Sequence, residues 1–172
     1  MRRLFDIDLK DYAACTRTYR RDSARGIILR SGRVAMIRSR RDGYYKFPGG
    51  GIEPGETQEE AMIREVREEA GLIVRLDTVR EYGMVHRIQR NPGNPEEIFV
   101  QDNYYYLCEA EEEILPPQME DYEAAAGFEP VFVEAREAIR VNREGAPGSR
   151  YQTMLLREAR VLEMLIEEGI IN

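Results

Sequence analysis

The stretch from Gly50 to Leu72 reads GGIEPGETQEEAMIREVREEAGL and carries the strongest structural signals in the chain. Thr57 is followed three residues later by Glu60, which is the spacing of a capping box at the start of a helix. Gly71 is the residue type on which helices commonly end, because glycine readily adopts the left-handed conformation. The stretch therefore predicts a helix from Thr57 to Ala70.

Three carboxylates share one face of this predicted helix. Glu65, Glu68 and Glu69 are spaced i, i+3 and i+4, which places them side by side. Their mutual repulsion raises their pKa values, so the cluster favours a nearby cation. Oxygen-rich clusters suit Mg²⁺, Mn²⁺ or Ca²⁺. The alternative is a solvated acidic face, which is common on glutamate-rich helices. A separate apolar stripe is available for burial: Met62, Ile63, Val66 and Ala70.

The residues around the carboxylates favour a bound ion over a solvated face. Gly49-Gly50-Gly51 let the backbone approach an ion or a phosphate closely. Arg64 and Glu68 have the i, i+4 spacing of an ion pair that holds a carboxylate in place. Glu56 stands just before the helix. A structural Ca²⁺ or Mg²⁺ site is a further alternative, but the chain lacks the aspartate-rich loop of an EF-hand.

The same stretch resembles the Nudix box, Gly-x5-Glu-x7-Arg-Glu-U-x-Glu-Glu-x-Gly-U, in which U is a large aliphatic residue. Every defined position is met at the right spacing: Gly50, Glu56, Arg64, Glu65, Val66, Glu68, Glu69, Gly71 and Leu72. The segment Phe47-Pro48-Gly49-Gly50 also looks like the usual lead-in to this motif. The resemblance implies an α/β/α sandwich, with a mixed β-sheet flanked by helices.

The resemblance also implies a reaction. Most Nudix proteins hydrolyse a nucleoside diphosphate linked to another group X, by attack of water on phosphorus with the help of Mg²⁺ or Mn²⁺. Glu65, Glu68, Glu69 and the Gly50 carbonyl would then be metal ligands. Glu56 and Arg64 would orient that cluster from outside it.

The general base stays open between the box and a later loop. Glu68 and Glu69 are the candidates inside the box, and they join Arg64 in the expected catalytic set. Outside the box we favour Glu123, with Glu120 as second choice, in the acidic segment before Gly127-Phe128. The alternative is that this segment is only a solvated loop.

Substrate contacts are expected before the box. Tyr45 or Phe47 could stack on a base, although core packing is an equal alternative for both. Arg25 could bind a terminal phosphate, as could Arg38 and Arg40, or all three could be solvated. The identity of X is open: ADP-ribose or a nucleotide sugar, a damaged nucleoside triphosphate, a dinucleoside polyphosphate and a capped RNA end all fit the box.

The rest of the chain predicts an α+β fold, because strands outnumber helices and do not alternate regularly with them. Segments 24–29 and 34–37 form a predicted hairpin. A long strand is expected over 98–108, a surface loop over 109–122 and a last amphipathic helix over 151–168. Residues 1–172 are expected to form one domain, with 1–20 an N-terminal arm or an extra strand.

Composition narrows the partners and the compartment. The chain has 172 residues and a net charge of −7, which argues against a general nucleic-acid binder. No apolar run is long enough for a membrane span or a signal peptide, so we expect a cytoplasmic protein. Cys15 and Cys108 follow no metal spacing and are expected to be reduced. Homodimers are frequent among proteins that resemble this one.

Two functions of different class follow. The first is a divalent-metal-dependent pyrophosphohydrolase that acts on a small nucleoside diphosphate derivative. The second is a regulator that binds a nucleotide ligand on the same fold without turnover. A complete box favours the enzyme, since a non-catalytic protein would usually show a damaged one.

Overall fold

Helix α1 (Gln58–Ala70) forms as predicted in the computed structural model, which describes residues 1–172. The Thr57 hydroxyl accepts from the backbone amide of Glu60, and the Glu60 carboxylate accepts from the backbone amide of Thr57. Gly71 ends the helix at φ 66°. A Cβ atom at this position would lie 1.9 Å from the Leu115 carbonyl oxygen, so only glycine fits without a shift of the backbone.

The centre of the fold is a nine-stranded mixed sheet in the order β1-β8-β9-β3-β4-β11, with β2, β5 and β6 attached to its strands. Strands β1/β8, β2/β9 and β3/β9 are parallel, and the other pairs are antiparallel. The hairpin predicted before the box is confirmed as β3 and β4. The strands are β1 (Arg3–Asp8), β2 (Arg17–Arg20), β3 (Ser23–Arg30), β4 (Arg33–Ser39), β5 (Tyr44–Lys46), β6 (Gly49–Gly51), β8 (Arg80–Asn91), β9 (Asn94–Cys108) and β11 (Phe128–Val133), while β7 (Leu72–Val74) and β10 (Ala110–Ile114) form a separate pair.

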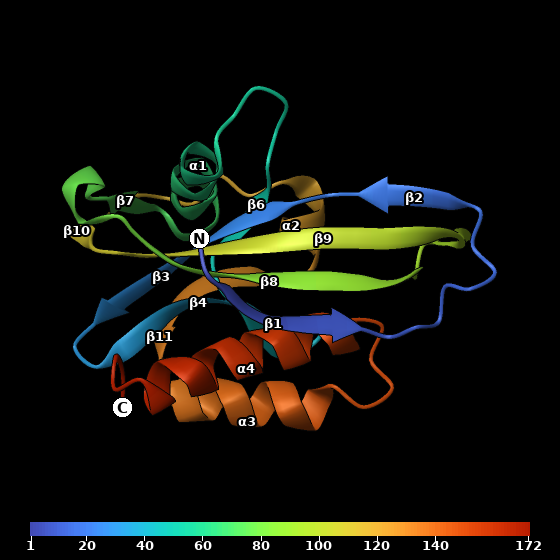
Figure 1. Ribbon diagram of the computed structural model, residues 1–172. Coiled ribbons are helices and arrows are strands. Elements are labelled where there is room, and N and C mark those ends of the chain that lie inside the picture. The colour runs from blue at the N-terminus through green and yellow to red at the C-terminus, as the bar shows by residue number, and fades with distance from the viewer.

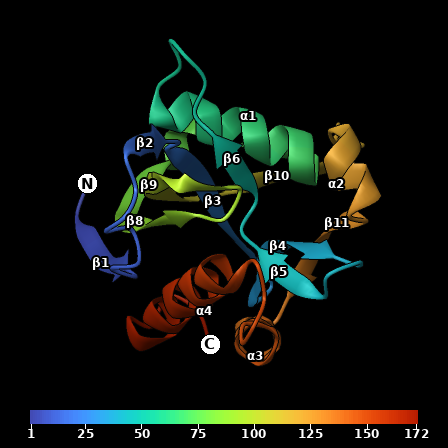
Figure 2. The same cartoon turned by 90° about the vertical axis from the view of Figure 1, so that its right-hand side faces the viewer.

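Helices cover both faces of the sheet, as the predicted sandwich requires. Figures 1 and 2 show α1 on one side and the pair α3 (Ala135–Gly145) and α4 (Gln152–Glu167) on the other. Met62 and Val66 of α1 pack into one hydrophobic cluster, and Leu162 of α4 into a second. Each such buried side chain stabilises the fold by roughly 1.5–3 kcal/mol. No helix combines the length and the apolar character needed to cross a bilayer.

Residues 1–20 are ordered parts of the sheet and not a loose arm. β1 pairs in parallel with β8, and β2 pairs in parallel with β9, so this segment supplies two strands. The extra-strand alternative therefore describes it better. Its weak hydrophobic patterning follows from its place at the margin of the sheet, where most of its residues are exposed or half-buried.

The segment predicted as a surface loop over 109–122 contains regular structure. Residues 110–114 form β10, which pairs with β7 beyond the end of α1. The helix α2 (Asp121–Ala125) then begins at a capping box between Glu120 and Glu123. Strand β9 begins earlier than the predicted 98–108, and it meets β8 in a hairpin at residues 91–94. Pairing with neighbouring strands holds these polar sequences extended, which their patterning alone did not predict.

The last helix carries more than an apolar stripe. Leu155, Leu162 and Leu165 are buried, as the pattern predicts. Two charged residues of the same helix, Arg157 and Glu158, are also buried, with exposed fractions of 1 % and 0 %. Nothing in the apolar spacing predicts this, since charged residues are almost never fully buried unless they are paired.

Candidate functional site

The glycines of β6 place the backbone directly against α1. A Cβ atom at Gly50 would lie 2.5 Å from the carboxylate of Glu65, so a side chain at this position would displace that carboxylate. The Glu65 carboxylate therefore lies directly against the Gly50 backbone. Burial, followed by the negative charge of Glu69, raises the pKa of Glu65, and this is the electrostatic setting that favours a cation.

Arg64 ties the polar face of α1 together. Its Nε and Nη2 donate to the two Glu56 carboxylate oxygens at 2.7 and 3.0 Å. Its Nη1 donates to Glu65 at 2.9 Å and to Glu68 at 3.1 Å, and its Nη2 also reaches the Gly51 carbonyl at 3.0 Å. The hydrogen bond from Arg64 lowers the pKa of Glu56. These contacts agree with the bracing predicted for Glu56 and Arg64.

Glu69 is buried and held on both carboxylate oxygens. One oxygen forms an ion pair with Lys46, and the other accepts from the Gly49 backbone amide at 2.9 Å. The Lys46 ammonium also lies 4.9 Å from the centre of the Phe128 ring, a cation–π distance. Lys46 was not among the predicted site residues. Its position directly before the box, as one of two lysines in the chain, was the available signal.

Glu123, the acid favoured outside the box, lies at the same site. It is buried in α2, and its carboxylate accepts from the backbone amide of Glu120 at 2.9 Å and from the Tyr122 hydroxyl at 3.2 Å. Burial, together with a hydrogen bond to Glu69 and the charge of that group, raises the pKa of Glu123 to about 7. The prediction of a purely solvated loop is therefore wrong for this residue.

One cavity collects the predicted carboxylates. Its volume is about 580 Å³, within the usual size range of a ligand pocket. Glu65, Glu68, Glu69 and Glu123 all line it, together with the Gly50 backbone. The structure thus brings together the box acids and the acid outside the box, from two helices that are separated by residues 71–120.

The donor set fits a hard divalent cation. All five groups offer oxygen, which Mg²⁺ and Mn²⁺ prefer. In the arrangement described here no three acidic, histidine or cysteine side chains converge closely enough to hold an ion. Arg64 and Lys46 instead take up carboxylate oxygens. These two cations supply the positive charge that balances the carboxylates in this structure.

Of the three residues predicted to contact the substrate, one lines the cavity and two do not. Arg25 lines the cavity, and its Nη1 donates to the carbonyls of Phe47 and Gly49. The Phe47 ring is fully buried against Tyr105, with ring centres 5.6 Å apart, so it cannot stack on a base and the core-packing alternative holds. Tyr45 does not line the cavity, because its side chain packs against the hydrophobic cluster that includes Leu162 of α4.

The other two candidate arginines are also placed away from the cavity. Arg38 and Arg40 both pair with Glu129 on exposed surface. The residues that do line the cavity beside Arg25 were not predicted, namely Arg21, Arg87, Phe99 and Gln101. Alternation along β8 and β9 was the signal that could have placed Arg87 and Phe99 on one face.

Comparisons with known proteins agree with this architecture. The NUDIX domain family model matches residues 20–155. An ADP-ribose pyrophosphatase from Methanocaldococcus jannaschii is 39% identical over 57 residues, which cover 31% of this chain and 34% of that protein. A CTP pyrophosphohydrolase from Escherichia coli is 38% identical over 65 residues, or 36% of this chain and 46% of that protein. The chain thus spans about a third to a half of the length of these curated relatives.

Solved structures share the fold. A NUDIX hydrolase from Nitrosomonas europaea superposes with a TM-score of 0.57 at 15% identity, covering 83% of this chain and 90% of that chain. A MutT NUDIX hydrolase from Burkholderia pseudomallei gives a TM-score of 0.52 at 21% identity, covering 69% and 85%. With a family model that matches most of its length and a complete motif at its cavity, the chain belongs to the Nudix family.

Proposed function

We propose that this protein is a divalent-metal-dependent pyrophosphohydrolase that cleaves a nucleoside diphosphate linked to another group X. The observation that carries the proposal is the single cavity lined by Glu65, Glu68, Glu69 and Glu123, beside the Gly50 backbone. These carboxylates do not form a simple solvated face. Arg64 pairs with Glu65, Lys46 pairs with Glu69, and α2 adds a further carboxylate to the same cavity.

Each residue has a proposed role. Glu65, Glu68, Glu69 and the Gly50 carbonyl hold Mg²⁺ or Mn²⁺, which when bound neutralises pyrophosphate oxygens and activates water. Glu56 and Arg64 fix the orientation of these carboxylates. Glu123 is the proposed general base, because Tyr122 and the backbone amide of Glu120 hold it in the cavity beside Glu69. Glu68 and Glu69 are the alternatives.

The similar proteins act on different substrates, so they indicate a range of candidates and not one compound. The similar proteins include an ADP-ribose pyrophosphatase, a CTP pyrophosphohydrolase and an RNA pyrophosphohydrolase from Serratia proteamaculans, the last 49% identical over 49 residues. We propose a small nucleotide derivative, since the net charge of −7 disfavours long RNA. We also propose that residues 1–172 form one domain, that the protein is cytoplasmic and that it forms a homodimer.

A screen for the two cleavage products tests the enzyme against the non-catalytic regulator. Hydrolysis of the pyrophosphate bond gives a nucleoside monophosphate and the phosphorylated group X, so the release of these products is measured. Purified protein with Mg²⁺ or Mn²⁺ meets a panel of nucleoside diphosphate derivatives, and Glu68→Gln is compared with Glu59→Gln. Glu59 lies on the same helix, is exposed and is absent from the cavity that holds the box carboxylates, so it matches the change in chemistry.

We expect metal-dependent release by the wild type and by Glu59→Gln, and loss of release in Glu68→Gln with an unchanged melting temperature. Ligand binding in a thermal-shift assay without release from any compound would reject the hydrolase in favour of the regulator. Full activity of Glu68→Gln would reject the assignment of the site.

A further inference from the structure

The cavity that holds the box carboxylates shares lining residues with a second cavity, which we call the arginine lobe. It has a volume of about 400 Å³, and its lining includes Arg21, Arg25, Arg87, Arg150 and Arg157 but no acidic side chain. Arg21, Arg25 and Arg87 line both cavities, so they form the junction. Five arginines without an acid, in a chain of net charge −7, mark this place as a site for an anion.

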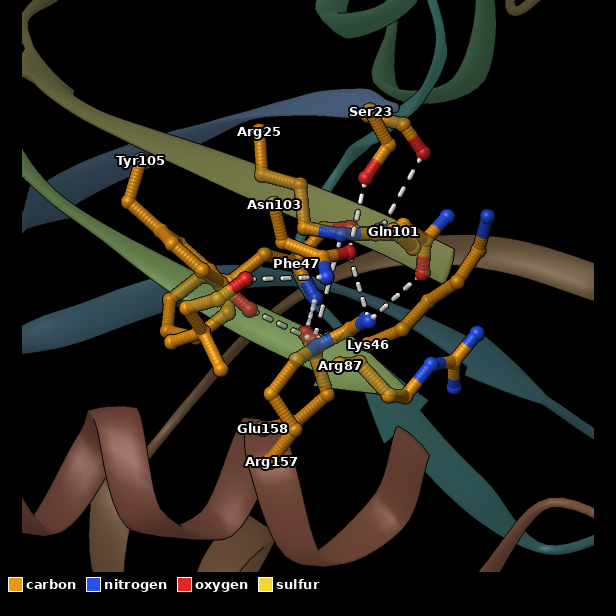
Figure 3. A network of polar contacts seen from close by, with 12 residues as sticks. Ser23, Arg25, Lys46, Phe47, Arg87, Gln101, Asn103, Tyr105, Arg157 and Glu158 are labelled. Carbon is orange, nitrogen blue, oxygen red and sulfur yellow. Dashed lines mark hydrogen bonds and ion pairs between the residues drawn. The ribbon is translucent and has the colours of Figure 1, made fainter. Parts of the chain in front are cut away.

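Glu158 is the carboxylate nearest the two buried arginines of this lobe, Arg25 and Arg157. In Figure 3, Arg157 and Glu158 rise from α4 toward the strands. The Arg157 guanidinium donates to Glu158 at 2.6 and 2.9 Å and to Asn103 at 2.6 Å, so Arg157 is satisfied. Arg25 is 7 % exposed, its Nε lies 3.9 Å from Glu158, and that Nε has no hydrogen-bond partner. Glu158 therefore compensates the charge of Arg157 and leaves that of Arg25 only partly balanced.

Arg87 has no acidic partner. Its single side-chain hydrogen bond goes to the Thr153 hydroxyl at 3.3 Å, its Nε is buried without a partner, and its guanidinium lies 4.7 Å from the centre of the Phe99 ring. Burial, reinforced by the charges of Arg157 and Arg25, lowers the pKa of Arg87 to about 9, so the group is still charged at neutral pH. A half-buried charge that no carboxylate pairs with is costly, and an anion bound at the junction would reduce that cost.

We propose that the arginine lobe binds a phosphate group of the substrate other than the two joined by the cleaved bond. The inference rests on the proposed function, and it narrows X. Three guanidiniums at the junction match a phosphate, because arginine binds phosphate oxygens in a bidentate fork. The preferred substrate therefore carries a third phosphate, either at the end of a polyphosphate chain or as a monoester on a sugar. A nucleoside diphosphate joined to a neutral sugar lacks this group.

A binding measurement that needs neither metal nor turnover tests the lobe. Melting temperatures are measured in EDTA at constant ionic strength with increasing inorganic phosphate, for the wild type, Arg87→Gln and Arg90→Gln. Arg90 lies three residues further along β8, is exposed and is absent from both cavities, so it is the matched control. Arg150→Gln changes an exposed arginine of the lobe and serves if Arg87→Gln does not fold.

We expect a saturable rise in melting temperature for the wild type and Arg90→Gln. Phosphate binding should weaken about tenfold or more in Arg87→Gln, equivalent to about 1.4 kcal/mol, and by less in Arg150→Gln. An equal rise in all four proteins, or no rise in the wild type, would overturn the proposal.

Substrate pairs then distinguish the source of the phosphate. One pair is a nucleoside triphosphate and the corresponding nucleoside diphosphate sugar, and the other is a dinucleotide with and without a 2′-phosphate. In the pair that matches the true substrate, kcat/KM should favour the phosphate-bearing compound, and Arg87→Gln should reduce that preference about tenfold. Hydrolysis without any such preference would reject the lobe and leave the proposed function standing. Phosphate binding without hydrolysis of any compound would support the anion site and reject the pyrophosphohydrolase.

Discussion

Helices α1 and α4 face each other across the sheet and use charge in opposite ways. On α1 the carboxylates line a cavity and are held by cations that an ion could replace. On α4 the carboxylate of Glu158 is fully buried and accepts from Arg157, from the Phe47 backbone amide at 2.7 Å and from the Tyr105 hydroxyl at 3.0 Å. Helix α1 thus gathers its carboxylates around a cavity, whereas α4 uses a buried carboxylate to connect the helix to the sheet.

The largest expected effect is on α4. Glu158→Gln leaves the Arg157 guanidinium buried without its counterion, so we expect a loss of about 3–5 kcal/mol in the free energy of unfolding. Chemical denaturation measures this loss, with Glu167→Gln as control on the exposed face of the same helix. The control should change stability by no more than about 0.5 kcal/mol. Equal stability of Glu158→Gln and wild type would remove the contrast between the helices.

The next effect is on activity, at the brace of α1. Arg64→Gln frees Glu56, Glu65 and Glu68 from a shared partner while leaving each of them in place. We expect activity to fall about 10–100-fold, the usual cost of removing a group that orients metal ligands. Steady-state kinetics and a titration of the metal requirement measure it. A variant with full activity at every metal concentration would show that the carboxylates need no brace.

A pH series sharpens the role of Glu158. Burial alone would raise its pKa, but the charges of Arg157 and Arg25 and the Phe47 amide together lower it below its ordinary value. The unfolded chain then takes up the proton first, so this residue stabilises the fold above about pH 4.3 and loses that contribution as the pH falls further. The stability difference between wild type and Glu158→Gln should narrow below that pH. Parallel curves down to strong acid would contradict the assignment.

The smallest expected effect is at the start of α1. Thr57→Ala removes the side-chain half of the capping box and should cost about 1 kcal/mol of stability. Thermal unfolding measures it, and the rate of pyrophosphate-bond cleavage should be unchanged, because Thr57 is absent from the cavity that holds the box carboxylates. A large loss of activity would show that the cap also positions the metal site.

The comparison of α1 with α4 also shows which features could be predicted from the sequence, namely those that depend on local spacing. Every signal on α1 is local: the cap at Thr57, the spacing of Glu65 with Glu68 and Glu69, and the end at Gly71 follow from helix geometry. The α+β class follows from patterning along the chain. The helix and the fold class are confirmed by the structure.

The features that escaped prediction depend on contacts between distant segments. Arg157 and Glu158 look like the polar side of an amphipathic helix, and only Phe47, Tyr105 and Asn103 from the sheet make their burial tolerable. Phe47 was offered as a substrate contact for the same reason, since its core partners lie far away in the chain. Strand β10 needed β7 as a partner before its acidic sequence could be extended.

The most direct test of the central claim is the affinity of the protein for Mn²⁺, measured by electron paramagnetic resonance of free Mn²⁺. The account predicts saturable binding by the wild type and by Glu59→Gln, weakened at least about tenfold in Glu68→Gln. Identical binding by all three proteins, or no saturable binding by the wild type, would contradict the claim that the polar face of α1 is a metal centre.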